Sequence, residues 1–400
     1  MAASAASAAP WPQYRGSDDN ATTSEQIKPW SGELKQLWKI PVGDGFGSFA
    51  VSDAKAYLFA KQGADDEACF CYDAADGKQL WVTDIDKTTH NRDGGEGPRT
   101  TPAVSDGLVF VYSTYLKLAC LSAADGKVVW SHDIESEFRG QNNTNGIKQW
   151  GNSISPVLDG DRVIVTGGGP GATYLAFDKA TGKLLWKTGS DKITHASPTL
   201  ATILGQKQII FFMQSGLVSL DPANGKELWR QPFRFNVSTA ASPVVGGTVV
   251  YCSAGYGVGA AAYHIVKQGD RWASTPLWQT PGDNINHWTT AVYHNGYLYG
   301  LYGFKEFNKE PLKCIDLRNG KTMWSKPGFG QGGLILAGDH LLIQGDQGQL
   351  VLASAKPDAY RELAHARPLS GKAWQMPVLA DGKIFTRTSG EGQAVCLEAK

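Results

Sequence analysis

The chain has 400 residues, of which 42% are hydrophobic and only 19% are charged. Lys plus Arg and Asp plus Glu number 38 each, and this balance, without a basic run, argues against a nucleic-acid-binding surface. No apolar run approaches the roughly 20 residues that a helix needs to cross a bilayer, so we expect no transmembrane segment. The 47 glycines are typical of many short strands joined by tight turns.

The first 29 residues form a lead-in segment without a repeat pattern. Residues 1–10 are mostly Ala and Ser and resemble the tail of a cleaved export signal behind an initiator Met. Residues 11–29 are polar and irregular. The start of the chain therefore predicts an exported protein, periplasmic or secreted, whose folded domain begins at residue 30.

One short phrase recurs along the chain and places a glycine four residues before a tryptophan. A glycine supplies the positive φ of a tight hairpin turn, and the tryptophan on the outgoing strand can cover the neighbouring unit. The spacing of about 40 to 56 residues suits one blade of a β-propeller. The tryptophans of the phrase are Trp81, Trp130, Trp186, Trp229 and Trp324, with Trp278 filling the one wide gap.

Strand openings and turns divide the chain into eight such units. We therefore predict an all-β fold, an eight-bladed β-propeller of four-stranded antiparallel blades, as a single domain over residues 30–400. The predicted blades are 45–86, 98–135, 151–189, 194–232, 238–280, 287–326, 329–367 and 372–400 plus 34–40.

The last blade is split between the two ends of the chain. Residues 34–40 contain Trp38 and have the pattern of an outgoing strand, but no hairpin partner precedes them. Residues 394–398 have the pattern of an incoming strand without its tryptophan. We expect these two strands to pair and to close the ring.

Four of the six cysteines occupy equivalent places in different repeats. Cys71, Cys120 and Cys314 each stand six residues before the turn glycine, and Cys396 falls at the matching place in the last blade. Equivalent residues of different blades lie in different sheets, so their thiols are too far apart to bond. We expect them to be small buried residues rather than disulfide partners.

A second set of equivalent positions varies in chemistry from blade to blade. It lies three residues before the proline, or its equivalent, that opens each blade, and these positions should surround one mouth of the central channel. The alternative is that they only line a channel that must contain some side chains. The eight positions hold Phe46, Arg99, Ser153, His195, Ala240, Trp288, Gln331 and Trp374.

Aromatic faces, one guanidinium, an imidazole and an amide are the groups of a ligand site. The spacing of eight blades sets Arg99 across from Trp288 and His195 across from Trp374. His195 is the candidate catalytic base, because an ordinary imidazole pKa lies near neutrality. The predicted ligand-binding residues are Phe46, Arg99, Asn152, His195, His287, Trp288, Gln331 and Trp374.

Two oxygen-rich loop clusters contain side chains that could bind Ca²⁺. One combines Asp93 with Glu96, and the other combines Asp283 with Asn284 and Asn286. Neither has the spacing of an EF-hand loop. We therefore predict no metal site from the sequence.

The repeat phrase resembles the tryptophan-docking motif of the PQQ-like, or quinoprotein alcohol dehydrogenase-like, β-propellers. Residues 176–186 fit the motif A-x-D-x-x-T-G-x-x-x-W at every fixed position. The resemblance covers about residues 30–400, and residues 11–16, Trp-Pro-Gln-Tyr-Arg-Gly, are similar to the mature start of exported bacterial members.

The resemblance implies two possible functions, which we keep open. Some members are periplasmic dehydrogenases that carry pyrroloquinoline quinone (PQQ) and Ca²⁺ in the funnel, whereas others bind partners without a cofactor. This chain has neither the adjacent Cys-Cys pair of the larger quinoproteins nor a C-x-x-C-H haem motif, so PQQ with calcium is possible but not favoured. We predict a scaffold that binds a small-molecule or carbohydrate ligand, or a protein partner, through its funnel. The alternative is an enzyme acting there on a carbohydrate or alcohol, including a quinone-dependent dehydrogenase.

Overall fold

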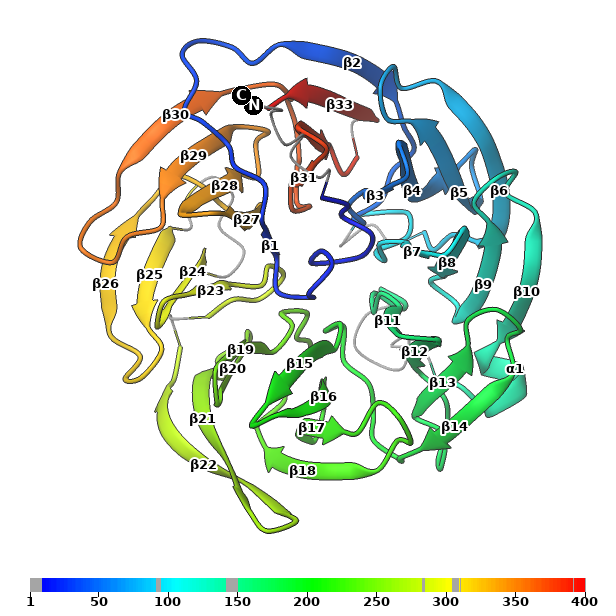
Figure 1. The fold of residues 1–400 in the computed structure, drawn as a ribbon, viewed down its shortest axis with the longest axis vertical. Helices are drawn as coiled ribbons and strands as arrows, with labels where there is room; N and C mark the ends of the chain where they lie inside the picture. Colours follow the sequence, from blue (N-terminus) through cyan, green and yellow to red (C-terminus); the bar gives the residue numbers. More distant parts are fainter. Residues whose placement is uncertain are drawn as a thin grey trace, which may run out of the picture.

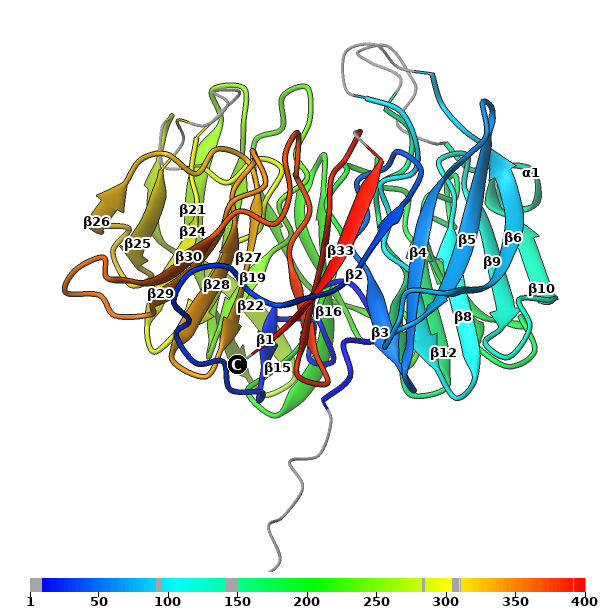
Figure 2. The same ribbon diagram turned by 90° about the horizontal axis from the view of Figure 1, so that it is seen from above.

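A computed structural model describes residues 9–90, 95–141, 150–282, 285–303, 309, 311–390 and 392–399. Eight four-stranded antiparallel sheets stand around a common centre and form a disc-shaped ring (Figures 1 and 2). This confirms the predicted eight-bladed β-propeller. The predicted blades end within two residues of the sheets, whereas each begins four to six residues before its innermost strand. The five-residue helix α1 (Ile134–Phe138) follows the second blade.

In each of the first seven blades the chain runs from the innermost strand to the outermost. Blade 1 contains β3 (Ala50–Ser52), β4 (Lys55–Gln62), β5 (Asp66–Asp73) and β6 (Gln79–Lys87). Blade 2 contains β7 (Ala103–Ser105), β8 (Leu108–Tyr112), β9 (Lys117–Ser122) and β10 (Val128–Asp133). Blade 3 contains β11 (Val157–Asp159), β12 (Arg162–Thr166), β13 (Tyr174–Asp178) and β14 (Leu184–Thr188). Blade 4 contains β15 (Thr199–Ile203), β16 (Gln206–Met213), β17 (Gly216–Leu220) and β18 (Glu227–Pro232).

The second half of the ring follows the same plan. Blade 5 contains β19 (Val244–Gly246), β20 (Val249–Ala254), β21 (Gly259–Gln268) and β22 (Arg271–Thr280). Blade 6 contains β23 (Val292–His294), β24 (Tyr297–Leu301), β25 (Leu312–Asp316) and β26 (Thr322–Lys326). Blade 7 contains β27 (Gly333–Ala337), β28 (His340–Gln344), β29 (Leu350–Ser354) and β30 (Glu362–Ala366). Blade 8 contains β31 (Val378–Ala380), β32 (Lys383–Arg387), β33 (Gln393–Glu398) and β2 (Gln36–Pro41).

The ring closes as the sequence predicts. β2, from near the N-terminus, pairs antiparallel with β33 from the C-terminus, with Trp38 opposite Cys396 and Ile40 opposite Ala394. The outer strand of blade 8 therefore comes from one end of the chain and the other three strands from the other end. This pairing leaves no open seam in the ring.

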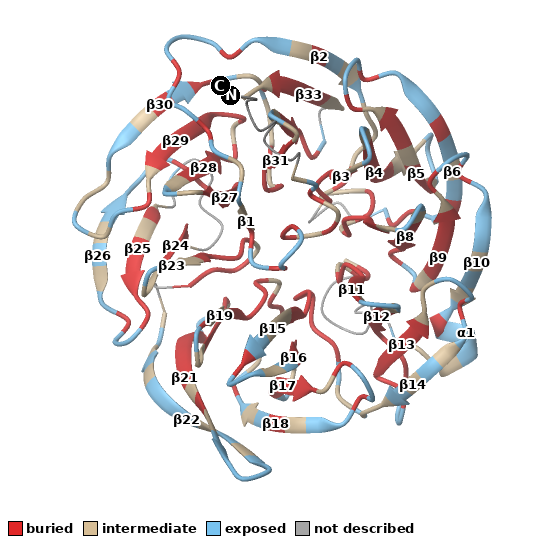
Figure 3. Ribbon diagram, in the orientation of Figure 1, coloured by how far each residue is buried: buried red, intermediate tan, exposed pale blue. Residues whose placement is uncertain are grey.

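Burial of the strands depends on their place in the blade. The middle strands are buried on both faces by neighbouring blades, whereas most exposed positions lie on the outermost strands (Figure 3). A β-bulge between the third and fourth strands bends the outer strand and increases its local twist. Every blade has a register shift of this kind, for example between Val128 and Trp130 in β10.

The tryptophans after these bulges connect neighbouring blades. Six of them donate the indole N–H to a backbone carbonyl three residues before the turn glycine position of the next blade, whereas Trp229 donates to Gln208 within its own blade. The six donations run from Trp38 to Ala74, Trp81 to Ala123, Trp130 to Lys179, Trp186 to Pro222, Trp278 to Leu317 and Trp324 to Lys356.

The turn glycines are required for two reasons at once. Their φ angles lie between 73° and 75°, a region that other residues adopt only with strain. A Cβ on any of them would also lie 2.6–2.9 Å from an atom of the indole above it. The five glycines are Gly77, Gly126, Gly182, Gly225 and Gly320.

Four of the cysteines lie opposite a tryptophan of the outer strand, where only a small side chain leaves room for the indole. The residue opposite each outer-strand tryptophan is always small: Cys in four blades, and Ala or Ser in three. Blade 7 reverses the sizes, with Leu352 opposite Ala364. All six cysteines are buried free thiols, which confirms their interpretation as small buried residues.

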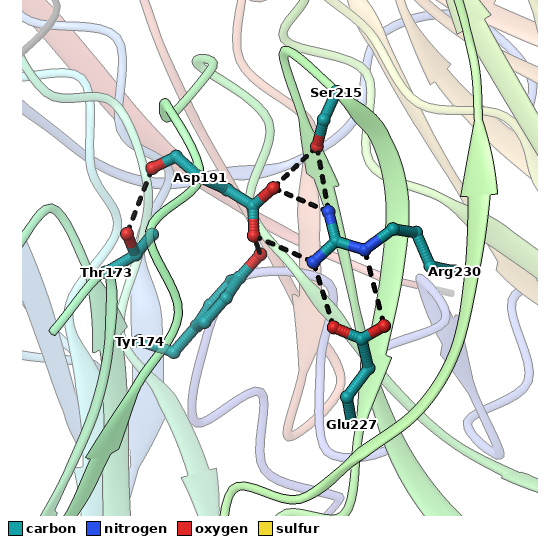
Figure 4. Close-up of polar contacts among 6 residues, drawn as sticks. All are labelled: Thr173, Tyr174, Asp191, Ser215, Glu227 and Arg230. Atoms are coloured by element: carbon teal, nitrogen blue, oxygen red, sulfur yellow. Dashed lines mark hydrogen bonds and ion pairs between the residues drawn. The ribbon is translucent and has the colours of Figure 1, made fainter. Parts of the chain in front are cut away.

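A polar cluster joins blades 3 and 4 near their outer strands (Figure 4). The carboxylate of Asp191 accepts hydrogen bonds from both terminal nitrogens of Arg230 (2.6 and 3.1 Å), from Ser215 (2.7 Å) and from Tyr174 (2.9 Å). Arg230 also pairs with Glu227 on its own strand. Burial alone would raise the pKa of Asp191, but these hydrogen bonds outweigh it and hold the pKa below its ordinary value.

The indole contact gives a stability prediction. Trp38 is 5% exposed and packs against Phe49, Phe385 and Gly77. Trp38→Ala should therefore lower the free energy of unfolding by about 3 to 5 kcal/mol, the usual cost of deleting a buried aromatic side chain. Urea unfolding measures the change. The exposed Leu185→Ala is the control, and a loss under about 1 kcal/mol for Trp38→Ala would refute the role of this contact.

The polar cluster gives a pH-dependent prediction. Arg230→Ala should lower the free energy of unfolding at pH 7 by about 1 to 2 kcal/mol, because Asp191 loses its charged donor. Because the folded-state pKa of Asp191 lies below the unfolded value, this contribution exists above about pH 4 and disappears as the pH falls through the folded-state pKa. Unfolding curves from pH 3 to 7 should show the two proteins converging in acid. Arg361→Ala, which breaks a pair with Asp358, should give a much smaller change, because both side chains are exposed and solvent screens them.

Candidate ligand-binding funnel

A cavity of about 470 Å³ lies at the centre of the ring, and all eight blades contribute to its wall. Seven of the eight predicted mouth positions line this cavity. Tyr14, from the lead-in segment, also lines it. The segments before the innermost strands thus converge on one space, which we call the funnel. The mouth positions on its wall are Phe46, Arg99, Ser153, His195, Ala240, Trp288 and Trp374.

An aromatic cluster forms one side of the funnel. Trp288 and Trp374 stack with ring centroids 4.7 Å apart and planes 18° apart, and Phe46 lies 5.9 Å from Trp374. The guanidinium carbon of Arg99 lies 4.4 Å from the centre of the Phe46 ring. The sequence analysis predicts that Trp288 lies across the ring from Arg99 and that Trp374 lies across from His195. In the structure the two indoles contact each other, because blade 7 between them presents only Gly332 and Gly333 beside Leu334.

His195 is a neutral group in the funnel wall. Burial and then the positive charge of Arg99 lower its pKa to about 3. Its Nδ1 lies 2.9 Å from the Ser238 hydroxyl, and its ring meets Trp150 edge to face at 5.6 Å. Its Nε2 has no hydrogen-bond partner among the described residues. The lowered pKa disfavours the predicted role of His195 as a general base at neutral pH, and the neutral ring is suited to hydrogen bonding.

Below the aromatic cluster runs a belt of hydroxyl groups. Six blades carry Ser or Thr two residues after the mouth position, and successive blades are hydrogen-bonded through them. Thr101, Ser155 and Ser197 each accept the backbone N–H of the preceding belt residue at 3.0 Å, and Thr290 accepts that of Ser242 at 2.9 Å.

The belt has consequences for a ligand. A hydroxyl has one proton and two lone pairs, so an oxygen that already accepts an N–H keeps its proton for donation. Ser155, Ser197 and Thr290 line the funnel and no donation by their hydroxyls occurs among the described residues. These groups favour a ligand with acceptor oxygens at the floor of the funnel.

The charge of the funnel is one-sided. Among the described lining residues Arg99 is the one with a charged side chain, and none is Asp or Glu. The Lys372 ammonium lies 3.6 Å from the centre of the Trp374 ring and 5.0 Å from that of Phe46, which adds a second positive charge beside the aromatic cluster. Burial lowers the pKa of Arg99 to about 10, so it remains a cation at neutral pH. The wall therefore favours neutral polar or anionic ligands over cations.

The described wall does not fit PQQ held together with Ca²⁺. Calcium takes six to eight oxygen ligands, largely carboxylates and carbonyls, whereas this wall has no carboxylate. Within the described ranges no three His, Cys, Asp or Glu side chains are grouped closely enough to hold a metal. Of the two loop clusters that the sequence suggested, Glu96 pairs with Lys61 and Asn286 bonds Tyr251, while Asp93, Asp283 and Asn284 lie outside the described residues.

Three predicted ligand residues lie off the funnel wall. Asn152 is held inside the protein, where its side chain donates to the Ser113 carbonyl and accepts from the Ile154 amide. His287 is fully buried behind Trp288, with their rings 4.9 Å apart. Gln331 is 1% exposed and does not line the funnel. Any contribution of these three to ligand contact would be indirect.

Among the wall residues that the sequence did not predict, three lie outside the repeat positions. Trp150 and Tyr256 come from the longer loops, and Tyr14 comes from the lead-in segment. None of the three occupies a repeat position, so comparison of the blades could not reveal them. The length of the loops was the one available signal, because loops that exceed the repeat minimum often carry binding residues.

These features define an eight-bladed propeller with a polar, carboxylate-free funnel. A family model described as outer membrane protein assembly factor BamB matches residues 65–302. That match covers more than half of the chain, so the chain belongs to this family of PQQ-like repeat proteins. No curated protein sequence gives a match.

Solved structures show the same fold at low sequence identity. BamB from Moraxella catarrhalis superimposes with a TM-score of 0.62 at 12% identity, over 92% of this chain and 98% of that one. Quinohemoprotein alcohol dehydrogenase from Comamonas testosteroni gives 0.64 at 14% identity, over 98% and 80%. The computationally designed protein Ika8 gives 0.62 at 13% identity, over 91% and 99%. At these identities the likeness establishes the fold alone.

The environment of His195 gives a direct test of the funnel's electrostatics. We expect its imidazole to stay neutral from about pH 5 to 8, because burial and Arg99 lower its pKa to about 3. Arg99→Gln should raise this pKa, although not to the ordinary value, because burial is the larger cause. NMR titration of the ring Cε1–H signal, assigned with His195→Gln, measures both proteins. A midpoint near 6.5 in the wild type would contradict the buried position.

Proposed function

We propose that the protein is an exported binding protein whose funnel holds a small, flat, acceptor-rich ligand, with an acidic sugar as the leading class. The observation that carries this proposal is the convergence of seven divergent blade positions on one cavity. The aromatic cluster of Phe46, Trp288 and Trp374 offers apolar ring surface to a sugar, and Arg99 offers a cation to an acidic group. The Lys372 ammonium, over the Trp374 ring, adds a second positive charge beside this cluster. The hydroxyl belt offers donors to the remaining oxygens.

Binding is better supported than catalysis on a carbohydrate. Glycoside hydrolysis generally uses a pair of carboxylic side chains on either side of the scissile bond, and the described wall has none. The candidate base, His195, is neutral and has a low pKa. An enzyme that oxidises an alcohol with PQQ and Ca²⁺ is likewise not favoured by this wall.

Export is part of the proposal. It is supported by the small-residue start of the chain and by the family, whose description names an outer membrane assembly factor. No helix in the described ranges has the length and apolar character of a membrane span.

A protein-interaction scaffold is the second candidate. The family description supports it, and so do apolar side chains on the rim of the disc. The residue just before the outer-strand tryptophan is exposed and apolar in five blades, so a partner could contact several blades at once. These residues are Leu80, Val129, Leu185, Leu277 and Met323.

Calorimetry with defined ligands separates the two candidates. The probes are galacturonate and glucuronate oligomers, matched neutral oligomers, and PQQ with and without Ca²⁺. We expect the acidic oligomers to bind, and Arg99→Gln to weaken them at least tenfold while leaving weaker neutral binding unchanged. Trp374→Ala should weaken both classes, because it removes the stacking face.

The controls decide between the funnel and the rim. Arg361→Ala, a surface change far from the funnel lining, should leave every affinity unchanged. If no probe binds the wild type, or if binding survives both funnel substitutions in folded protein, the funnel proposal is wrong. The rim of the disc would then be the better candidate.

A further inference from the structure

The lower mouth of the ring, where Figure 2 shows the lead-in segment, is surrounded by backbone donors. The innermost strand of each blade has one partner only, so alternate residues direct N–H and C=O toward the centre. In β3, for example, Ser52 pairs with Lys55 beside the turn. The residue before Ser52 is Val51, and its N–H points away from β4 toward the centre, where it meets the Trp11 carbonyl. The mouth is thus a ring of N–H groups that need acceptors.

The lead-in segment supplies acceptors to five of these innermost strands. It crosses the centre of the ring in Figure 1 and meets blades 1, 2, 3, 4 and 7 in turn. The acceptors are the carbonyl of Trp11 for Val51 (2.8 Å), the carbonyl of Pro12 for Val104 (2.8 Å), the side chain of Gln13 for Leu158 (3.2 Å), the carboxylate of Asp19 for Leu200 (2.7 Å) and the carbonyl of Ala21 for Leu336 (2.9 Å).

The segment continues in the same manner beyond these strands. β1 (Thr22–Thr23) adds a parallel strand to β27, and the Glu25 carboxylate accepts the N–H groups of Asp381 (2.6 Å) and Gly382 (3.0 Å). Three donors stay open. The residues that correspond to Val51 in blades 5, 6 and 8 have no backbone partner on that side among the described residues; they are Val245, Tyr293 and Leu379.

Several features of the lead-in segment oppose its binding to the ring. Arg15, Asp19 and Ala21 have φ angles of 64°, 53° and 60°, a conformation that costs non-glycine residues about 1 kcal/mol or more each. Arg15 is 1% exposed, and its Nε and Nη1 have no hydrogen-bond partner among the described residues. Burial raises the pKa of Asp19 to about 7, so its charged form is held at a cost. These costs partly offset the stabilisation that the hydrogen bonds of the segment provide.

We propose that the lower mouth is a peptide-docking site, which the lead-in segment occupies in cis and which an acidic segment of another polypeptide with the same turned path occupies in its place. The mouth selects for a turned path, because its donors are spaced around a ring and residues 13–21 of the resident segment follow them through turns. It selects for acceptors and carboxylates, because Asp19 and Glu25 each satisfy backbone donors. The open donors of blades 5, 6 and 8 give a competing segment a place to bind before the resident one leaves. Because Tyr14 lines the funnel, exchange also alters the funnel floor.

The test uses the full chain, folded first and then cut. Residues 31–33 are exposed, and Gly32 has open space around it, so a protease site placed there can be cleaved after folding. The probe is a fluorescent synthetic peptide of residues 9–30. We expect it to enter the cut protein, to raise fluorescence anisotropy, and to exchange out again on addition of unlabelled peptide.

Matched peptides keep the test specific. A peptide with both Gln13→Ala and Asp19→Ala lacks the side-chain acceptors for Leu158 and Leu200, and it should bind at least tenfold more weakly. A scrambled peptide of the same composition should not compete. If the labelled peptide fails to enter while circular dichroism shows the cut ring folded, or if the doubly substituted peptide binds equally well, the proposal is overturned. Neither result depends on a ligand in the funnel.

Discussion

The contact of an indole with a turn glycine holds the ring together. Each blade is a separate hydrogen-bonded sheet, so the joints between blades depend on side-chain packing. In five joints an outer-strand tryptophan covers the left-handed glycine of the next blade and donates its N–H to a carbonyl beside that turn, as Trp186 does to Pro222. The β-bulge before the tryptophan bends the outer strand, and the small residue on the neighbouring strand leaves room for the indole. One phrase in the sequence therefore specifies the turn, the bulge and the joint together.

This repeated joint allows the funnel wall to vary. Because the scaffold contacts lie on the outer strands, the residues that precede the innermost strands carry little of the packing and can differ between blades. Arg99, His195 and Trp374 occupy equivalent places and have unrelated chemistry. The hydroxyl belt below them adds bonds between blades, as from Thr101 to Ser155, so the wall is held rigid while its upper residues remain variable.

The repeat pattern was sufficient to predict the blades, the closure of the ring and seven of the positions that line the funnel. Local phrases set turns and outer strands, and equivalence between blades then located seven wall positions, including Phe46 and Ala240. The pattern could not give the pKa of His195, because burial and the distance to Arg99 depend on packing between blades. It also missed the stacking of Trp288 on Trp374, which depends on how far side chains reach across the glycines of blade 7. Tyr14 lies outside the repeat altogether.

The free thiols opposite the tryptophans have a consequence for the sensitivity of the fold to oxidation and reduction. Cys71, Cys120, Cys314 and Cys396 lie in four different sheets, each fully buried and facing an indole across its own strand pair. Burial raises the pKa of each of these thiols to about 12, so the reactive thiolate is scarce. The fold is therefore indifferent to the redox state of its surroundings, and its assembly needs no oxidase or disulfide isomerase.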